Sequence, residues 1–152
     1  MDTLSPDRCR QLLEEAVYGD LAMVADGVPY VTPISFVLVR DGLYIRSGPG
    51  RRLAALHTNP TVCFSVVDFS SETGEWASAL VTGDVEFVDA PECEAEAVAL
   101  LLAKYRAYEP AMGVALTEFP GSQTVTLWLS TSETTGRNSG GSLAPRTRPG
   151  RL

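Results

Sequence analysis

The chain has 152 residues, of which 45% are hydrophobic and 20% charged, a composition that predicts one globular domain able to fold without disulfides. The formal net charge is −7, and the last 15 residues hold three arginines and no acidic residue, so residues 1–137 carry −10. So acidic a body argues against nucleic acids and anionic membranes as partners.

Three widely separated cysteines and one histidine, His57, offer no ligand set with the spacing of a structural metal site. The N-terminal stretch lacks a charged-then-apolar signal segment, and no apolar run reaches the roughly 18 residues of a membrane span. We therefore expect no metal, no membrane partner and a soluble, cytoplasmic protein whose cysteines stay reduced.

The first elements are a helix and a hairpin. Ser5 is a suitable N-cap and Pro6 a suitable first helical residue, and we expect the helix to end at Gly19. A strand over 21–25 and the Asp26-Gly27 pair then predict a type I′ hairpin, whose second strand runs from residue 28 to about 39.

That second strand contains Pro33, which lacks the N–H group that a sheet ladder needs. The proline marks either a bulge, at which the backbone of Thr32 and Ile34 could bind a ligand, or an ordinary edge strand. Asp41-Gly42 predicts a second hairpin turn, which leads into a strand over 43–45.

The next stretch has the features of an anion site. The strand continues into Arg46 and Ser47, and a Gly-Pro-Gly loop then opens a helix with Arg51 and Arg52 in its first turn. A helix start is already positive and usually carries acidic residues, so two arginines there favour a bound phosphate. The alternative is a solvated helix start with two surface arginines.

Further elements follow in order. Asn59-Pro60 ends the short helix, on whose exposed side we expect His57, outside any catalytic role. We expect strands over 61–69, over 76–88 with a bend at Gly83, and over 122–129, and a long helix from 89 or 90 to 108. Residues 109–121 are expected to be irregular.

About six strands and three helices without a β-α-β alternation predict an α+β fold, an antiparallel barrel with helices packed outside it. The composition shifts to Ser, Thr, Gly, Pro and Arg after Ser130. We expect a domain over 1–133 and a Gly/Pro/Arg-rich C-terminal tail over 134–152.

The order of these features resembles the pyridoxamine 5′-phosphate oxidase-like family of FMN-binding split barrels. The stretches that carry the resemblance are D-G-V-P-Y-V-T-P-I at 26–34, L-Y-I-R-S at 43–47, G-R-R-L at 50–53 with N-P at 59–60, and W-A-S-A-L-V-T-G-D-V-E-F-V at 76–88. The resemblance is good over residues 4–88 and weak over the C-terminal third of the chain. It implies a six-stranded antiparallel split β-barrel and an FMN at a homodimer interface.

The resemblance also implies roles for residues at the cofactor. The backbone of Thr32, Pro33 and Ile34 would lie by the flavin ring, Arg46 and Ser47 by the ring or ribityl chain, and Arg51 and Arg52 at the phosphate. Trp76 and the segment from Trp128 to Arg137 would approach from the second subunit. The alternative for Trp76 and Trp128 is packing in the core, which is the favoured one for Trp128. Relatives often have lysine at position 52 and, where they bind nitro compounds, histidine at position 46.

The function implied is a flavin-dependent oxidoreductase acting on a small organic substrate. The residues that recognise pyridoxamine phosphate are not recognisable, so vitamin B6 is not assigned as substrate. With one histidine there is no Ser-His-Asp set, and no catalytic residue is identified; Tyr44 is one candidate for proton transfer. The alternatives are an F420-dependent reductase of the same fold and a non-catalytic flavin-binding or carrier module.

Overall fold

The structure is a computed structural model that describes residues 1–108 and 124–140. Within these residues the chain forms ten strands, three α-helices and one short 3-10 helix. The strands are β1 (Asp2–Thr3), β2 (Gly19–Ala25), β3 (Val28–Ile34), β4 (Phe36–Val39), β5 (Gly42–Ser47), β6 (Thr61–Phe69), β7 (Trp76–Asp84), β8 (Glu86–Val88), β9 (Val125–Ser130) and β10 (Thr134–Asn138). The helices are α1 (Pro6–Glu15), α2 (Arg51–Thr58), α3 (Pro91–Tyr105) and the 3-10 helix η1 (Arg106–Tyr108).

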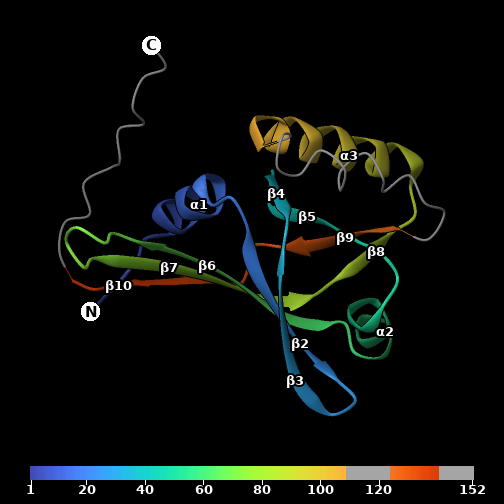
Figure 1. Cartoon of the computed structure of the whole chain (residues 1–152), viewed down its shortest axis with the longest axis horizontal. Coiled ribbons are helices and arrows are strands. Elements are labelled where there is room, and N and C mark those ends of the chain that lie inside the picture. The colour runs from blue at the N-terminus through green and yellow to red at the C-terminus, as the bar shows by residue number, and fades with distance from the viewer. Residues whose placement is uncertain (109–123, 141–152) are drawn as a thin grey trace.

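The strands form two antiparallel sheets, as Figure 1 shows. One sheet has six strands in the order β1-β10-β7-β6-β2-β3, and the other has four in the order β4-β5-β9-β8. The α+β class is confirmed. The expectation of a six-stranded antiparallel split barrel is not confirmed, because the ten described strands divide between a six-stranded and a four-stranded sheet.

Two strands that the sequence predicted as continuous cross from one sheet to the other. The strand expected over 28–39 breaks at Ser35 into β3 and β4, and the strand expected over 76–88 breaks at Val85 into β7 and β8. Each crossing lets a single run of β-forming residues serve both sheets. The apolar core therefore fills the space between them; Phe36 of one sheet meets Phe64 of the other with ring centroids 4.7 Å apart.

The helices cover the sheets from separate sides (Figure 1). Helix α1 packs on β7, β10 and β6 through Cys9, Leu12 and Leu13, and its cap is Ser5, as predicted, whose hydroxyl accepts a hydrogen bond from the Arg8 N–H. Helix α2 lies beside β2, and α3 packs against β4. No described helix combines the length and apolarity that a membrane crossing needs.

Two predicted boundaries are corrected, and one predicted turn is confirmed. Helix α1 ends at Glu15 and Gly19 instead begins β2, where a Cβ would collide with the Phe64 ring. The first hairpin has positive φ at Asp26 and Gly27, which confirms the type I′ turn. The second hairpin turns at Arg40 and Asp41, because Gly42 is already paired with Val39.

The predicted tail also needs correction. Its first five residues form β10, which lies between β1 and β7 in the six-stranded sheet. Gly136 of β10 permits this packing, since a Cβ there would press on Cys9 of α1 and on the backbone of β7. The boundary at 133/134 therefore falls at the start of a strand, and β9 is not the last strand. Residues 109–121, expected to be irregular, and 141–152 of the tail lie outside the described residues.

Candidate functional site

The end of β5 and the start of α2 meet in a corner beside the β2–β3 hairpin. The N-cap of α2 is Gly50, with φ of 145°, a backbone conformation that favours glycine. No side chain caps this helix start, and its first turn holds no acidic residue. The free N–H groups and the helix dipole therefore add positive potential at the place where two arginines stand.

Arg52 is the centre of this corner. Its Nε donates to Ser47 Oγ at 3.1 Å, and its Nη1 donates to Thr32 Oγ1 at 3.3 Å. Burial lowers the pKa of Arg52 from its ordinary value, because the charged form loses hydration, yet a guanidinium stays protonated in proteins. Among the described residues no carboxylate lies within ion-pair distance of it. A half-buried cation without an anion is a costly arrangement that a bound anion would relieve.

Arg51 lies on the outer side of the same corner. It is exposed, and its guanidinium carbon lies 4.4 Å from the centroid of the Tyr30 ring, a cation–π geometry. Tyr30 and Thr32 are two residues apart on β3, so both side chains face α2. We call Tyr30, Thr32, Ser47, Arg51 and Arg52 the Arg52 corner.

The structure decides between the two hypotheses for Pro33. Strand β3 is at the edge of its sheet, and its register with β2 runs without interruption from Ala25–Val28 to Gly19–Ile34. Pro33 thus lies on an ordinary edge strand and not in a bulge. Of the three predicted ring neighbours, Thr32 joins the corner, Pro33 is exposed and Ile34 belongs to the core.

Arg46 lies on the opposite face of β5 from Ser47. Its Nη1 is 3.3 Å from Glu94 Oε1, which forms an ion pair, and 3.3 Å from Thr126 Oγ1. Arg46 is thus bound to α3 and β9 and does not join the Arg52 corner within this chain. Strand alternation between positions 46 and 47 was the signal that could have separated the two residues in advance.

Tyr44 belongs to the same joint between β5 and α3. It is buried, its hydroxyl donates to Glu96 Oε2 at 3.1 Å, and its ring lies 4.8 Å from that of Trp128. Burial, followed by the hydrogen bond to Glu96, raises the pKa of Tyr44. Arg40, 2.9 Å from Glu96, is the main cause that lowers the pKa of that carboxyl. Tyr44 therefore serves as a structural contact on the far side of β5 from Ser47.

Trp76 and Arg137 lie far from the corner within one chain. They share the outer face of the six-stranded sheet, since Arg137 pairs with Ser78 two residues along β7 from Trp76. Trp76 begins β7, whereas the strand's other end, Asp84, lies near α2, about 26 Å away along the strand. Their predicted approach from a second subunit stays a prediction.

Tyr30 belongs to the Arg52 corner, and His57 does not. Sequence reasoning missed Tyr30, although its spacing of two from Thr32 was a usable signal. His57 is exposed and stacks on Phe87 with ring centroids 4.4 Å apart, outside the Arg52 corner.

Known proteins resemble this chain in sequence and in fold. The model of the pyridoxamine 5′-phosphate oxidase family matches residues 5–138. The uncharacterized protein RA0666 of Rhizobium meliloti is 29% identical over 111 residues, which cover 70% of this chain and 73% of that protein.

Solved structures of flavin-binding proteins share the fold. An FAD-binding protein of Mesorhizobium loti is 24% identical with a TM-score of 0.68, and the match covers 90% of this chain and 95% of that one. An FAD- and heme-binding protein of Mycobacterium smegmatis is also 24% identical, with a TM-score of 0.69 and coverage of 90% and 72%. At this identity the likeness shows the fold, and each ligand is that protein's own.

Proposed function

Because the chain belongs to the pyridoxamine 5′-phosphate oxidase family, we propose that it is a flavin-dependent oxidoreductase that binds FMN with its phosphate at the Arg52 corner. This membership confirms the family that the sequence motifs indicated. The substrate is a small organic molecule. The observation that carries the proposal is the half-buried Arg52, which contacts two hydroxyl groups and no described carboxylate.

The corner fits a phosphate group. The two hydrogen bonds of Arg52 use only part of its N–H donors, and the remaining donors suit the oxygens of a phosphate. A Cβ added at Gly50 would meet nothing within 4 Å, so there is open space directly before the first N–H groups of α2. Arg51, held over Tyr30, adds a second positive charge at the rim of this space.

A bound flavin supplies a ring that accepts or delivers a hydride. This chain's own residues would bind the flavin and hold it in a fixed orientation. Arg52 and the start of α2 would hold the phosphate end, and the free edge of β3 at Thr32 would lie along the remainder of the molecule. Ser47 and Thr32 keep the Arg52 guanidinium in place before a ligand arrives, which lowers the ordering cost of binding.

We also propose that the flavin lies between two copies of the chain. The outer face of the six-stranded sheet carries Val31, Val67 and Leu80, whose residues are 61%, 66% and 40% exposed. The same face carries Trp76 and Arg137, so a second copy docked on it would bring those residues to the interface. Burial of such apolar side chains favours association.

Comparison of FMN with riboflavin tests the phosphate site directly, because riboflavin lacks only the phosphate. The wild-type protein should bind FMN more tightly, and the Arg52→Ala variant should reduce this preference by about 10- to 150-fold, the value of one charged hydrogen-bonded contact. Titration calorimetry or flavin fluorescence measures both affinities. Arg106→Ala removes an exposed arginine on η1 and should leave the preference unchanged. Equal affinity for the two ligands in the wild-type protein would refute the proposal.

Turnover separates the oxidoreductase from its two alternatives. Flavin-loaded protein should be reduced by NADH or NADPH and reoxidised by an added acceptor, which absorbance at the flavin band follows. Bound flavin that cannot be reduced by any nicotinamide would instead indicate a carrier. F420, whose phosphate could use the same arginines, would be recognised by preferential binding in the same titrations.

A further inference from the structure

One strand holds both arginines of the Arg52 corner. Arg52 Nη1 donates to Thr32 Oγ1 at 3.3 Å, and the guanidinium carbon of Arg51 lies 4.4 Å from the centroid of the Tyr30 ring. Consecutive residues of a helix point about 100° apart, so neighbouring arginines ordinarily face different directions. Tyr30 and Thr32 share one face of β3, about 7 Å apart along the strand. They therefore bring both guanidinium groups to that face.

Tyr30 offers Arg51 a fixed surface. Its ring is half-buried and packs against the hydrophobic core, whereas Arg51 is exposed. The side chain of Arg51 makes no hydrogen bond or ion pair with any residue that the structure describes. An exposed arginine without such a partner samples many rotamers, and contact with a ring anchored in the core restricts that freedom.

Tyr30 also lies close to the second arginine. Burial is the main cause that lowers the pKa of Arg52, and the charge interaction with Tyr30 acts on this pKa in the opposite direction. Charge interactions weaken with distance, so the effect places Tyr30 near Arg52 as well as beside Arg51. One side chain of β3 thus links the two cations.

We infer that Tyr30 is a positioning residue for the flavin phosphate, whose ring holds Arg51 where this guanidinium meets the same phosphate as Arg52. The inference rests on the proposed function. A phosphate monoester carries up to two negative charges at neutral pH, so a second cation adds to its binding. Because Arg51 is held in place before the ligand arrives, less conformational freedom is lost on binding. Tyr30 acts through Arg51 and does not itself contact the phosphate.

Removal of the ring tests this role. Tyr30→Leu should lower the preference for FMN over riboflavin about two- to fivefold, the range of an exposed cation–π contact. Tyr30→Phe keeps the ring and should retain the preference. Titration calorimetry with both flavins measures the two affinities of each protein. Their ratio is insensitive to a misfolded fraction, because that fraction lowers both apparent affinities equally.

A second substitution shows whether Tyr30 acts through Arg51. In the Arg51→Ala background, Tyr30→Leu should change the FMN preference no further. An equal loss with and without Arg51 would overturn the inference. An unchanged preference in Tyr30→Leu would overturn it too, and an increased preference would show that the ring draws Arg51 away from the phosphate.

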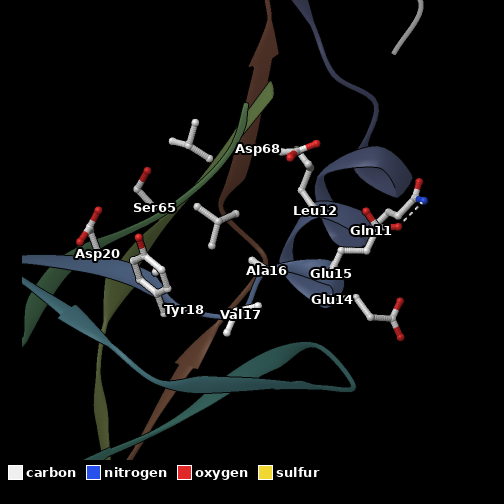
Figure 2. Close-up of a pocket in the computed structure, with 13 residues that line it drawn as sticks. Gln11, Leu12, Glu14, Glu15, Ala16, Val17, Tyr18, Asp20, Ser65 and Asp68 are labelled. Atoms are coloured by element: carbon white, nitrogen blue, oxygen red, sulfur yellow. Dashed lines mark hydrogen bonds between the residues drawn. The ribbon is translucent and has the colours of Figure 1, made fainter. Parts of the chain in front are cut away.

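A hollow elsewhere in the described chain supplies the matched control. It lies between the C-terminal end of α1 and β6 (Figure 2), has a volume of about 840 Å³ and shares no residue with the Arg52 corner. Its described lining includes Glu14, Glu15 and Asp20 and no lysine, arginine or histidine, so a phosphate would be repelled there. Tyr18, which is 62% exposed, also lines it.

Tyr18→Leu makes the same chemical change as Tyr30→Leu, away from the two arginines. It should leave the FMN preference unchanged, and an equal reduction by both variants would overturn the inference. A wild-type protein that binds both flavins equally would refute the phosphate site and this inference with it. If the wild-type protein prefers FMN and Arg52→Ala loses the preference while Tyr30→Leu keeps it, only the role of Tyr30 is refuted.

Discussion

At the scale of single residues, the most unusual charge outside the Arg52 corner is Lys104 on α3. Its Nζ donates to the Phe36 carbonyl oxygen at 2.8 Å and lies 3.7 Å from the centroid of the Phe36 ring. No described carboxylate lies within ion-pair distance of it, and burial lowers its pKa to about 8. The hydroxyl of the next residue, Tyr105, contacts the backbone of Phe36 and Val17. Together the two residues hold α3 to the crossing between the sheets.

The Lys104 pKa predicts a pH dependence of stability. An unfolded lysine has a pKa of about 10.4, above the folded value of about 8. Between these values the unfolded chain binds more protons, so the contribution of Lys104 to the free energy of unfolding rises with pH and is lost as the pH falls through the folded pKa. Urea unfolding between pH 7.5 and about 10 should therefore show the wild-type protein gaining stability relative to Lys104→Met.

The comparison with Lys104→Met is needed because other groups titrate in the same range. Burial raises the pKa of the Cys9 and Cys63 thiols and of the Tyr105 hydroxyl, and these groups lower stability at high pH. The contributions of the two thiols, which lie on α1 and β6, cancel in the difference between the two proteins. Parallel stability curves would show that Lys104 keeps its ordinary pKa in the folded chain.

At the scale of elements, the joint between β5 and β9 requires a residue without a side chain. Gly42 of β5 lies against the ring of Trp128, which is itself in contact with Tyr44. A Cβ at Gly42 would overlap the ring atoms. By contrast, a Cβ at Gly83 of β7 would meet only the tip of Leu129, at 3.3 Å. The surroundings of Gly83 can therefore make room for an added Cβ, whereas those of Gly42 cannot.

Substitution of these glycines should reveal the difference. Gly42→Ala should lower the free energy of unfolding by about 1–3 kcal/mol, the range for overpacking a rigid contact. Gly83→Ala should change it much less, because a leucine methyl group can shift by a few tenths of an ångström. Chemical denaturation measures both variants. A Gly42→Ala protein as stable as Gly83→Ala would show that Trp128 is free to move.

At the scale of the whole molecule, the six-stranded sheet has an apolar outer face while α1 and the second sheet cover its inner face (Figure 1). Val67 of β6 lies on this outer face, since it pairs with Ser78, the partner of Arg137. The proposed dimer buries this face. The flavin would then depend on residues from both copies, which links cofactor affinity to assembly.

A charge at the centre of this face should break the dimer. Val67→Glu should convert the protein to a monomer in sedimentation at micromolar concentration and weaken FMN binding, because a carboxylate cannot be buried there without a partner. Val28→Glu is the matched control, because Val28 is similarly exposed but pairs with Ala25 on the inner side of the sheet. A monomeric Val67→Glu protein with unchanged FMN affinity would separate the cofactor site from the interface.

Local patterns in the sequence determined several features of this protein without help from the fold. The run of β-forming residues that follows Asn59-Pro60 predicted the ends of β6 at Thr61 and Phe69. The Asp26-Gly27 pair predicted its turn, and the glycine and arginines at 50–52 predicted the start of α2 and its lack of an acidic cap. Each of these features depends on residues within one or two turns of the chain, which is the range over which backbone propensity acts.

Only the tertiary structure decided how these elements share the site. It divided two predicted strands between sheets at Ser35 and Val85, and it inserted residues 134–138 into a sheet. It also separated the arginines: Arg46 meets Glu94 on α3, whereas Arg52 lies between Ser47 and Thr32. Such contacts join residues distant in the chain, and they are selected by the packing of whole faces, which no local pattern specifies.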